Sequence, residues 1–455
     1  MSADEHQRPF ENRRLLVVST NYAPEVTGIG PYATQLAEHW AASGVRTEVL
    51  TGMPHYPAWR VDERYRGVWR KVETREGVRV HRRRHYVPPR QTALRRAAFE
   101  ASVLAHGILA PPPGRPDAVI SQMPSLAGGV IGARLARRHG VPHIPVVQDL
   151  MGAAAAQSGI RGGGRAAAVA AKAERHALRG AALVGVIHES FVEGVTALGV
   201  DPGRIRVVPN WTHVESPSAD RAATRARLGW REGTPVLLHS GNMGLKQGLD
   251  VLVGLARLAP DIRVVLMGDG NQRDGLRERA AGLPNLDFLP PAGAEEFTDV
   301  LAAADVLAVT QRASVLDMSV PSKLTSYFVS GRPVVASVAG EGGTADEVRR
   351  SGAGVLVAPE DPAALLAAVR ELVADPGAAS ALGAQGPRYV ADHLSREAGL
   401  ARFDALLREA LGGSEAREAG PGGSEAEEAR PGDARAGEAG PGGAEPGDAR
   451  GRARR

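Results

Sequence analysis

The chain has 455 residues, a formal net charge of only +4 and no cysteine. The lack of cysteine excludes disulfides, thiolate nucleophiles and cysteine-based metal sites, and the small net charge gives no reason to expect a nucleic-acid partner. The sequence contains no run of about 18 apolar residues, which is the length needed to cross a membrane. Residues 1–14 also lack the apolar region of a signal peptide, so we expect a cytoplasmic protein.

Short β-branched runs alternate with helical stretches rich in Ala, Leu and Arg from Arg13 to about Gly412. The predicted strands of the first half are residues 15–19, 47–51, 118–121, 143–148, 183–187 and 205–210. Those of the second half are residues 235–241, 262–270, 286–290, 306–310, 333–337 and 354–358. Apolar strands that alternate with helices indicate parallel sheets covered on both faces. We therefore predict an α/β protein with two doubly wound, Rossmann-like domains and a cleft between them.

The polar segment 211–235 separates the two series of strands and is a credible interdomain connection. We place a flexible N-terminus at residues 1–12, an N-terminal domain at 13–212 and a C-terminal domain at 213–394. Residues 412–455 contain no aromatic residue and no Leu, Ile or Val. Such a segment cannot bury enough apolar surface to offset its ordering entropy, so we predict a disordered tail.

The loop after the first strand contains Gly28 and Gly30, and residues 28–33 match the GxGxxA pattern of NAD-binding proteins. However, residues 21–27 separate this pattern from the strand, and the second strand ends at Thr51 where a dinucleotide site would have an acidic residue. The loop instead favours close approach of a substrate to its backbone. A purely structural turn is the alternative.

Four loops of the second half each join the end of a strand to the start of a helix. They lie within residues 239–256, 267–276, 319–337 and 340–348. Glycine-rich turns let backbone amides point inward, helix N-termini add positive potential, and Lys246 and Lys323 add charge. Any one loop could be an ordinary turn with a solvated lysine, but the set predicts a site for a nucleotide diphosphate.

Several motifs follow one another along the chain, namely NYAPEVTGIGPYATQLAEHWAASG, PHYPAW, VVQDL, SGNMGLKQGLD, GDG, VPSKLTSYFVSGRPVVAS and GGTADEV. In this order, they resemble the motifs of GT-B glycosyltransferases of the family 4 type, especially the bacterial exopolysaccharide group with colanic-acid biosynthesis enzymes. The resemblance implies two Rossmann-like domains, with the acceptor on the first and a nucleotide-sugar donor, such as a UDP- or GDP-sugar, on the second. It also implies transfer of a hexose-type sugar with retention at the anomeric carbon, without an obligatory metal ion or other cofactor.

The resemblance further implies which residues contact the donor. Diphosphate contacts would come from Gly241, Asn242, Lys246, Pro321, Ser322 and Lys323. The base and ribose would lie beside Gly268, Asp269 and Gly270, and the donor sugar beside Gly342, Gly343 and Thr344. The last helix, residues 395–411, would cross back to the N-terminal domain.

Retaining transfer without a covalent step needs a stabilised leaving diphosphate, which Lys323 and Lys246 would provide by electrostatic preorganisation. Asp149, just beyond the strand 143–148, is our candidate for stabilising positive charge at the anomeric carbon, with a helix N-cap as the alternative. His188, at the end of the strand 183–187, would orient a sugar hydroxyl, with a structural role as the alternative. His55 would line the acceptor cleft.

Two departures from the family pattern keep other functions open. Many relatives carry a pair of glutamates at the positions of Met318 and Ser326, and Asn242 and Gln247 stand where basic residues are usual. A non-catalytic nucleotide-sugar-binding partner and a GT-B sugar-nucleotide epimerase are therefore the alternatives to a glycosyltransferase acting on a glycan or lipid-linked acceptor in cell-surface polysaccharide synthesis.

Residues 81–109 predict contact with an anionic membrane. The segment combines arginines with an apolar helical set, namely Arg82, Arg83, Arg84, Arg90, Arg95 and Arg96 with Leu94, Ala98, Phe99, Val103, Leu104 and Ile108. Basic residues beside an apolar helical stripe suit the headgroup region of a membrane, which would place the protein at the inner face of the cell membrane. Packing of the stripe on the core of the N-terminal domain is the alternative.

Overall fold

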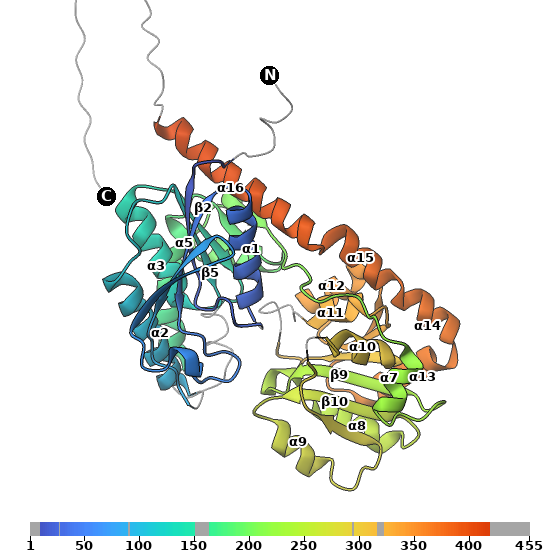
Figure 1. Cartoon of the computed structure of the whole chain (residues 1–455). Coiled ribbons are helices and arrows are strands. Elements are labelled where there is room, and N and C mark those ends of the chain that lie inside the picture. Colours follow the sequence, from blue (N-terminus) through green and yellow to red (C-terminus); the bar gives the residue numbers. More distant parts are fainter. Residues whose placement is uncertain are drawn as a thin grey trace, which may run out of the picture.

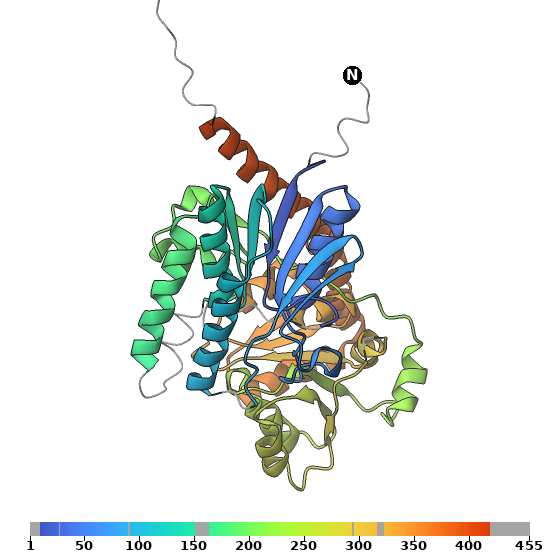
Figure 2. The ribbon, with the colours of Figure 1, turned by 60° about the vertical axis from the view of Figure 1, so that its left-hand side comes forward.

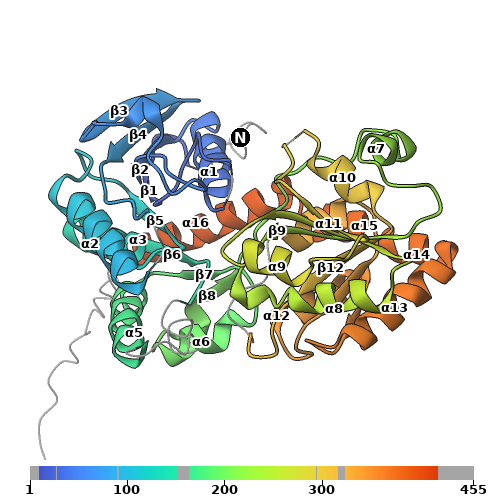
Figure 3. The same cartoon turned by 90° about the horizontal axis from the view of Figure 1, so that it is seen from below.

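The computed structural model describes residues 10–26, 28–89, 92–150, 163–293, 295–315 and 323–418. These residues form two domains, each with a central β-sheet between layers of helices, and one long C-terminal helix that bridges them (Figure 1). Viewed from below, the two sheets lie side by side (Figure 3). This is the predicted α/β architecture of two doubly wound domains.

The N-terminal sheet has eight strands in the order β3-β4-β2-β1-β5-β6-β7-β8. They are β1 (Arg14–Val18), β2 (Arg46–Gly52), β3 (Arg70–Arg75), β4 (Val78–Arg83), β5 (Ala118–Met123), β6 (His143–Val147), β7 (Val184–Val186) and β8 (Ile205–Val207). All neighbours are parallel except β3 and β4. This hairpin was not predicted, because β3 is an exposed edge strand of largely charged residues without an apolar run.

Helices cover both faces of this sheet. They are α1 (Gly30–Ala42), α2 (Ala93–Leu109), α3 (Leu126–His139), α5 (Gly163–Arg179) and α6 (Phe191–Ala197), with short 3-10 turns η2 (Glu63–Tyr65) and η3 (Pro202–Arg204). The helix α1 buries Tyr32, Leu36 and Trp40 against one face. The helices α2 and α3 pack on the other face, and so does α5 (Figure 2).

The C-terminal sheet has six parallel strands in the order β11-β10-β9-β12-β13-β14. They are β9 (Val236–Asn242), β10 (Arg263–Asp269), β11 (Leu286–Leu289), β12 (Val306–Thr310), β13 (Val334–Ser337) and β14 (Gly354–Val357). All six match predicted strands. Their runs are largely buried, as expected for a parallel sheet covered on both faces.

Two layers of helices sandwich the C-terminal sheet. The helices are α7 (Arg221–Arg227), α8 (Asp250–Leu258), α9 (Arg273–Arg279), α10 (Phe297–Ala303), α11 (Lys323–Val329), α12 (Gly343–Ser351), α13 (Pro362–Ala374), α14 (Pro376–Gly383) and α15 (Gln385–His393), with a 3-10 turn η4 (Leu245–Gln247). One core joins the sheet to α10, α11, α12 and α15, and a second joins it to α8 and α13. The start of each crossover helix is thereby brought to the carboxyl edge of the sheet.

The helix α16 (Arg396–Glu418) crosses back onto the N-terminal domain (Figure 1). The Trp40 Nε1 donates a 2.8 Å hydrogen bond to Asp404 Oδ1, and Phe403 and Leu407 are buried in the core that α1 covers. Two predicted boundaries need correction. Residues 412–418 continue the helix, because Ala, Glu and Arg extend an anchored helix readily, and Phe10, assigned to a flexible N-terminus, is 5% exposed in the same core.

Residues 81–109 do not form a single basic and apolar surface, which corrects the prediction for this segment. The Arg82 side chain is fully buried on β4, where its Nε lies 2.6 Å from Glu73 Oε1. Phe99 is 1% exposed, and Val103, Leu104 and Ile108 pack on the core beneath α2. Arg90 lies outside the described residues. Within the described part of the chain, no helix combines the length and apolarity needed to cross a membrane.

Candidate active site

At the carboxyl ends of β9 and β10, glycine residues leave the backbone atoms of the two strands without side chains and form one edge of the sheet. The two strands pair Gly241 with Gly268, and φ is +108° and +141° at these residues. A Cβ on Gly268 would lie 2.0 Å from the Gly241 carbonyl oxygen, and one on Gly270 would lie 2.5 Å from the Met243 carbonyl oxygen. Only glycine therefore fits here, and the edge can approach a ligand through its backbone.

The loop from Asn242 to Lys246 continues this edge into the turn η4. Both side chains are exposed, and the Lys246 carbonyl accepts a 3.0 Å hydrogen bond from the Arg312 amide, which holds the loop against the end of β12. The Asp269 carboxylate accepts a 2.8 Å hydrogen bond from the amide of Gly270 in its own turn. The edge thus combines an exposed cation, Lys246, with a carboxylate that hydrogen-bonds within the glycine turn.

Lys323 begins the helix α11 and reaches the same edge. Its Cε and Nζ lie 3.5 and 3.6 Å from the position of a Cβ on Gly241, and its Nζ lies 3.2 Å from the Nε2 of His239. Burial lowers the Lys323 pKa to about 7. The neighbouring candidates Pro321 and Ser322 lie outside the described residues.

The start of α12 brings Gly342, Gly343 and Thr344 to the edge. Gly342 caps the helix without a side-chain hydrogen bond, so the first amides of α12 are left to other partners. Thr344 is 2% exposed, and its Oγ1 has no hydrogen-bond partner among the described residues. This end of α12 offers donors for a polar or anionic group.

Asp149 lies on the N-terminal domain, two residues beyond the end of β6. Burial raises the pKa of its carboxyl to about 6, while the charges of Lys246 and Arg96 oppose that rise. The charge of Lys246, on the C-terminal domain, is therefore close enough to act on this carboxyl. The segment after Leu150, which the N-cap alternative for Asp149 requires, lies outside the described residues.

His188 also points toward the C-terminal domain. The amide of Ser190 donates to its Nδ1 at 3.1 Å, so the proton of a neutral ring is on Nε2. That Nε2 lies 3.8 Å from the Glu347 Oε2 on α12, and Glu347 also accepts a 3.0 Å hydrogen bond from the Tyr389 hydroxyl. His188 is therefore one half of a polar contact between domains, a partner that the sequence did not predict.

The amino-acid sequence matches known protein families over most of the chain. Residues 27–211 match the model of the glycosyl transferase 4-like domain, and residues 234–375 match that of glycosyl transferases group 1. The chain belongs to this glycosyltransferase family. The Escherichia coli (strain K12) protein WcaI, named for colanic acid biosynthesis as a glycosyl transferase, is 30% identical over 374 residues, covering 79% of this chain and 91% of that protein.

Further relatives support the same assignment. D-inositol 3-phosphate glycosyltransferase 1 of Catenulispora acidiphila is 28% identical, covering 86% of this chain and 92% of that protein. Sucrose-phosphate synthase from Thermosynechococcus elongatus has a TM-score of 0.69 at 20% identity, over 88% of this chain and 100% of that one. HepE of Anabaena, solved with UDP-glucose, has a TM-score of 0.62 at 16% identity, over 87% and 99%. The glycosyltransferase therefore has the GT-B fold, with two Rossmann-like domains across a cleft.

The N-terminal side of the glycosyltransferase cleft is organised by a buried carboxylate. The Glu25 Oε1 accepts hydrogen bonds of 2.7 Å from the amides of both His55 and Tyr56. A Cβ on Gly30 would lie 2.8 Å from the Glu25 carbonyl oxygen, and one on Gly28, whose φ is +65°, would lie 3.1 Å from the Tyr56 ring. The two predicted loops, residues 21–30 and 54–59, are therefore one unit.

The prediction that His55 lines the acceptor cleft is wrong. The His55 side chain is 4% exposed, and its Nδ1 lies 3.0 Å from the Met53 carbonyl oxygen. Its neighbour Tyr56 is 36% exposed and is the aromatic group that this loop presents. The ring of His55 instead supports the loop by packing on Trp59 and Phe99.

The family glutamate positions carry no carboxylate. Ser326 lies on α11 and is 5% exposed, whereas Met318 lies outside the described residues. Within the described part of the chain, no group of three or more His, Asp and Glu side chains is placed to hold a metal ion. Among the predicted donor contacts, the basic residues that lie at the edge formed by β9 and β10 are Lys246 and Lys323.

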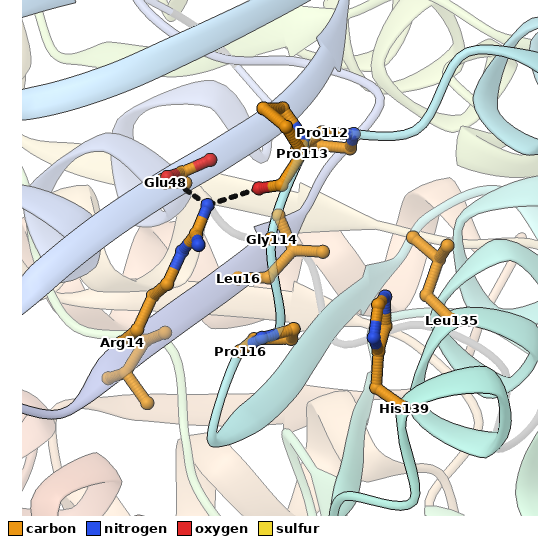
Figure 4. Close-up of a pocket in the computed structure, with 10 residues that line it drawn as sticks. Arg14, Leu16, Glu48, Pro112, Pro113, Gly114, Pro116, Leu135 and His139 are labelled. Atoms are coloured by element: carbon orange, nitrogen blue, oxygen red, sulfur yellow. Dashed lines mark hydrogen bonds and ion pairs between the residues drawn. The ribbon is translucent and has the colours of Figure 1, made fainter.

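A separate cavity lies at the opposite end of the N-terminal sheet (Figure 4). Arg14, at the start of β1, donates to Glu48 Oε1 at 2.6 Å and to the Pro113 carbonyl oxygen across its mouth. Ligands of doubly wound sheets bind beyond the carboxyl ends of the strands. This cavity, at the amino end of β1, is thus not part of the active site.

Proposed function

We propose that this glycosyltransferase moves a hexose-type sugar from a nucleotide diphosphate donor to a hydroxyl of a glycan or lipid-linked acceptor in cell-surface polysaccharide synthesis. The observation that carries the proposal is that a glycine backbone edge, the half-buried Lys323 and the start of the helix α12 lie together at one side of the cleft. The name of WcaI, which refers to colanic acid biosynthesis, supports the pathway class.

On the donor side, the diphosphate would bind the amides of Gly241 and Asn242 with the charges of Lys246 and Lys323. Pro321 and Ser322 are proposed as further contacts from the segment before α11. The leaving diphosphate gathers negative charge as the glycosidic bond breaks, and fixed donors in a partly buried site stabilise that charge without reorganisation. We propose that these groups act without an obligatory metal ion.

The other two turns would recognise the rest of the donor. The base and ribose would lie beside the end of β10, where Gly268 and Gly270 carry no side chain and Asp269 stands between them. At the start of α12, Gly343 and the partnerless hydroxyl of Thr344 would bind hydroxyls of the donor sugar, with Gly342 allowing close approach. A solved relative of the same fold, HepE, contains UDP-glucose, which supports a nucleotide sugar as the donor.

Across the cleft, the carboxylate of Asp149 would stabilise positive charge at the anomeric carbon, and the acceptor hydroxyl would attack on the face that the diphosphate leaves. This geometry gives retention. The Nε2 of His188 would orient a sugar hydroxyl or hold α12 through Glu347. The acceptor would contact the loop unit that carries Gly28, Gly30 and Tyr56.

A lipid-linked acceptor would lie at the inner face of the cell membrane. The exposed part of residues 81–109 that suits this contact is smaller than predicted and includes Arg84 and Leu94, the latter 81% exposed. We propose these residues as the membrane-facing part of the N-terminal domain.

A donor panel tests the function. The protein is mixed with UDP- and GDP-hexoses, first for binding and then for turnover with glycan and lipid-linked acceptors. We expect acceptor-dependent release of the nucleotide diphosphate. Donor binding without turnover would favour a non-catalytic binding partner, and interconversion of sugar nucleotides without acceptor would favour an epimerase.

A further inference from the structure

His239 is a polar ring in an otherwise apolar strand. The buried part of β9 reads Val-Leu-Leu-His-Ser, and His239 is 0% exposed. Burying an imidazole costs free energy unless both ring nitrogens find partners. The contacts of this ring therefore indicate what it does.

The tautomer of the ring follows from its neighbours. The Nδ1 lies 3.2 Å from the carbonyl oxygen of Ala308 on the adjacent strand β12, and a carbonyl oxygen can only accept. The Nδ1 therefore carries the proton. Burial holds the pKa of His239 well below its usual value, so the ring stays neutral and its Nε2 is a hydrogen-bond acceptor. The group placed to donate to it is the Nζ of Lys323, at 3.2 Å.

A second contact fixes the helix that carries the lysine. One turn beyond Lys323, the buried hydroxyl of Tyr327 accepts a 2.7 Å hydrogen bond from the amide of Ser240. Two successive residues of β9, His239 and Ser240, thus hold two successive turns of α11. The lysine stem passes Gly241, where a Cβ would lie 3.5 Å from the Lys323 Cε, in ordinary van der Waals contact.

We propose that His239 is the positioning residue for Lys323, accepting one N–H of the lysine so that the remaining N–H groups face the donor diphosphate at the Gly241 edge. This inference rests on the proposed function, in which Lys323 binds the diphosphate. A lysine side chain is flexible, so a partner that holds it before the donor arrives reduces the ordering cost of binding.

Few side chains can make both hydrogen bonds that position 239 requires. The side chain must donate to the Ala308 carbonyl and accept from Lys323 at once. The amide of a glutamine provides both a donor and an acceptor, whereas phenylalanine fills a similar space with neither. The structural requirement of a filled core and the positioning role can therefore be separated by substitution.

The test measures binding of free UDP and GDP to the full-length protein by isothermal titration calorimetry. The variants are His239→Phe, His239→Gln, Lys323→Ala and the double variant His239→Phe with Lys323→Ala. Thermal melting of each checks folding, and His239→Met replaces the Phe variant if that protein does not fold.

We expect His239→Phe to weaken nucleotide binding about tenfold, as for loss of a hydrogen bond to a charged group. The His239→Gln variant should recover most of that loss, and His239→Phe should have no further effect when Lys323 is already Ala. Wild-type affinity in His239→Phe, equal losses in Phe and Gln, or additive losses in the double variant would each overturn the proposal. If Lys323→Ala binds as tightly as the wild type, or the wild type binds neither nucleotide, the donor site of the proposed function fails instead.

Discussion

The two sides of the cleft present different groups to a ligand, mainly backbone on the C-terminal side and side chains on the N-terminal side. On the C-terminal side, the edge of β9 and β10 is backbone, shaped by glycines at which φ is positive and a Cβ would collide with a neighbouring strand. On the N-terminal side, the groups are buried or half-buried side chains, above all Glu25, Asp149 and His188. Backbone amides suit a phosphate group that every nucleotide donor shares, whereas side chains can differ with the acceptor.

This contrast predicts that the backbone edge of the donor side fails when space is lost, and that the side chains on either side of the cleft fail when a charge is lost. Substitutions of each kind separate the two cases.

The substitution Gly268→Ala should have the largest effect. Its Cβ would lie 2.0 Å from the Gly241 carbonyl oxygen, so the two strands must separate, at a cost of about 3 kcal/mol. We expect a lower melting temperature and no measurable nucleotide binding. The control is Gly282→Ala, where φ is +82° but nothing lies within 4 Å of the Cβ. It should lose only about 1 kcal/mol and keep binding, and equal behaviour of the two variants would mean that backbone strain, not the edge, explains the result.

The substitution Lys323→Ala should weaken donor binding tenfold or more, since a hydrogen bond to a charged group contributes roughly 1.5–3 kcal/mol. Stability should not fall, because a half-buried lysine whose pKa is lowered to about 7 is costly to keep charged. Calorimetric titration and thermal melting measure the two effects. Unchanged donor affinity would show that Lys323 does not bind the donor.

The substitution Asp149→Asn should reduce turnover more than donor binding, because the carboxylate is proposed to act on charge that develops during transfer. Wild-type activity should also fall as the pH drops below about 6, where this carboxyl takes up a proton. An Asn variant with wild-type turnover would leave Asp149 with the structural role.

The raised pKa of the Asp149 carboxyl also predicts how the stability of the folded protein depends on pH. Its folded pKa, about 6, lies above the ordinary 3.8, so the folded protein holds this proton more tightly than the unfolded chain does. The contribution of this site to stability is therefore present below about pH 4 and is lost as the pH rises through 6. Denaturant melts of the wild type and Asp149→Asn between pH 4 and 7 should differ in slope, with the Asn variant flatter.

The substitution Arg84→Glu should have the smallest effect, confined to membranes. Each basic residue near an anionic surface contributes on the order of 1 kcal/mol, so co-sedimentation with anionic vesicles should fall about fivefold at low salt. The buried Arg82 makes a poor test, because its loss would break the ion pair with Glu73. Equal binding of the wild type to neutral and anionic vesicles would contradict an electrostatic contact.

The sequence predicted the donor side better than the N-terminal side for a physical reason. Glycine turns after apolar strands are local patterns, so Gly241, Gly268 and Gly342 could be placed at one edge without a structure. The ion pair of Arg82 with Glu73 depends on a charged hairpin that has no apolar run. The contact of His188 with Glu347 depends on how the two domains meet, which no local pattern reports.

His239 shows a further reason why the role of a residue cannot be predicted from the sequence. A lone histidine in an apolar strand reads as a core residue, and its role depends on a helix that begins 84 positions later. The sequence signal for it is a histidine within a strand that ends in a glycine turn. Two such features on one strand favour a functional edge.

The most direct test of the account is a crystal structure of the protein with UDP or GDP, whichever binds. We expect the diphosphate within hydrogen-bond distance of the Lys323 Nζ and the amides after Gly241, with Asp149 facing it across the cleft. A nucleotide bound elsewhere, for example in the cavity beside Arg14, would contradict the donor site proposed here.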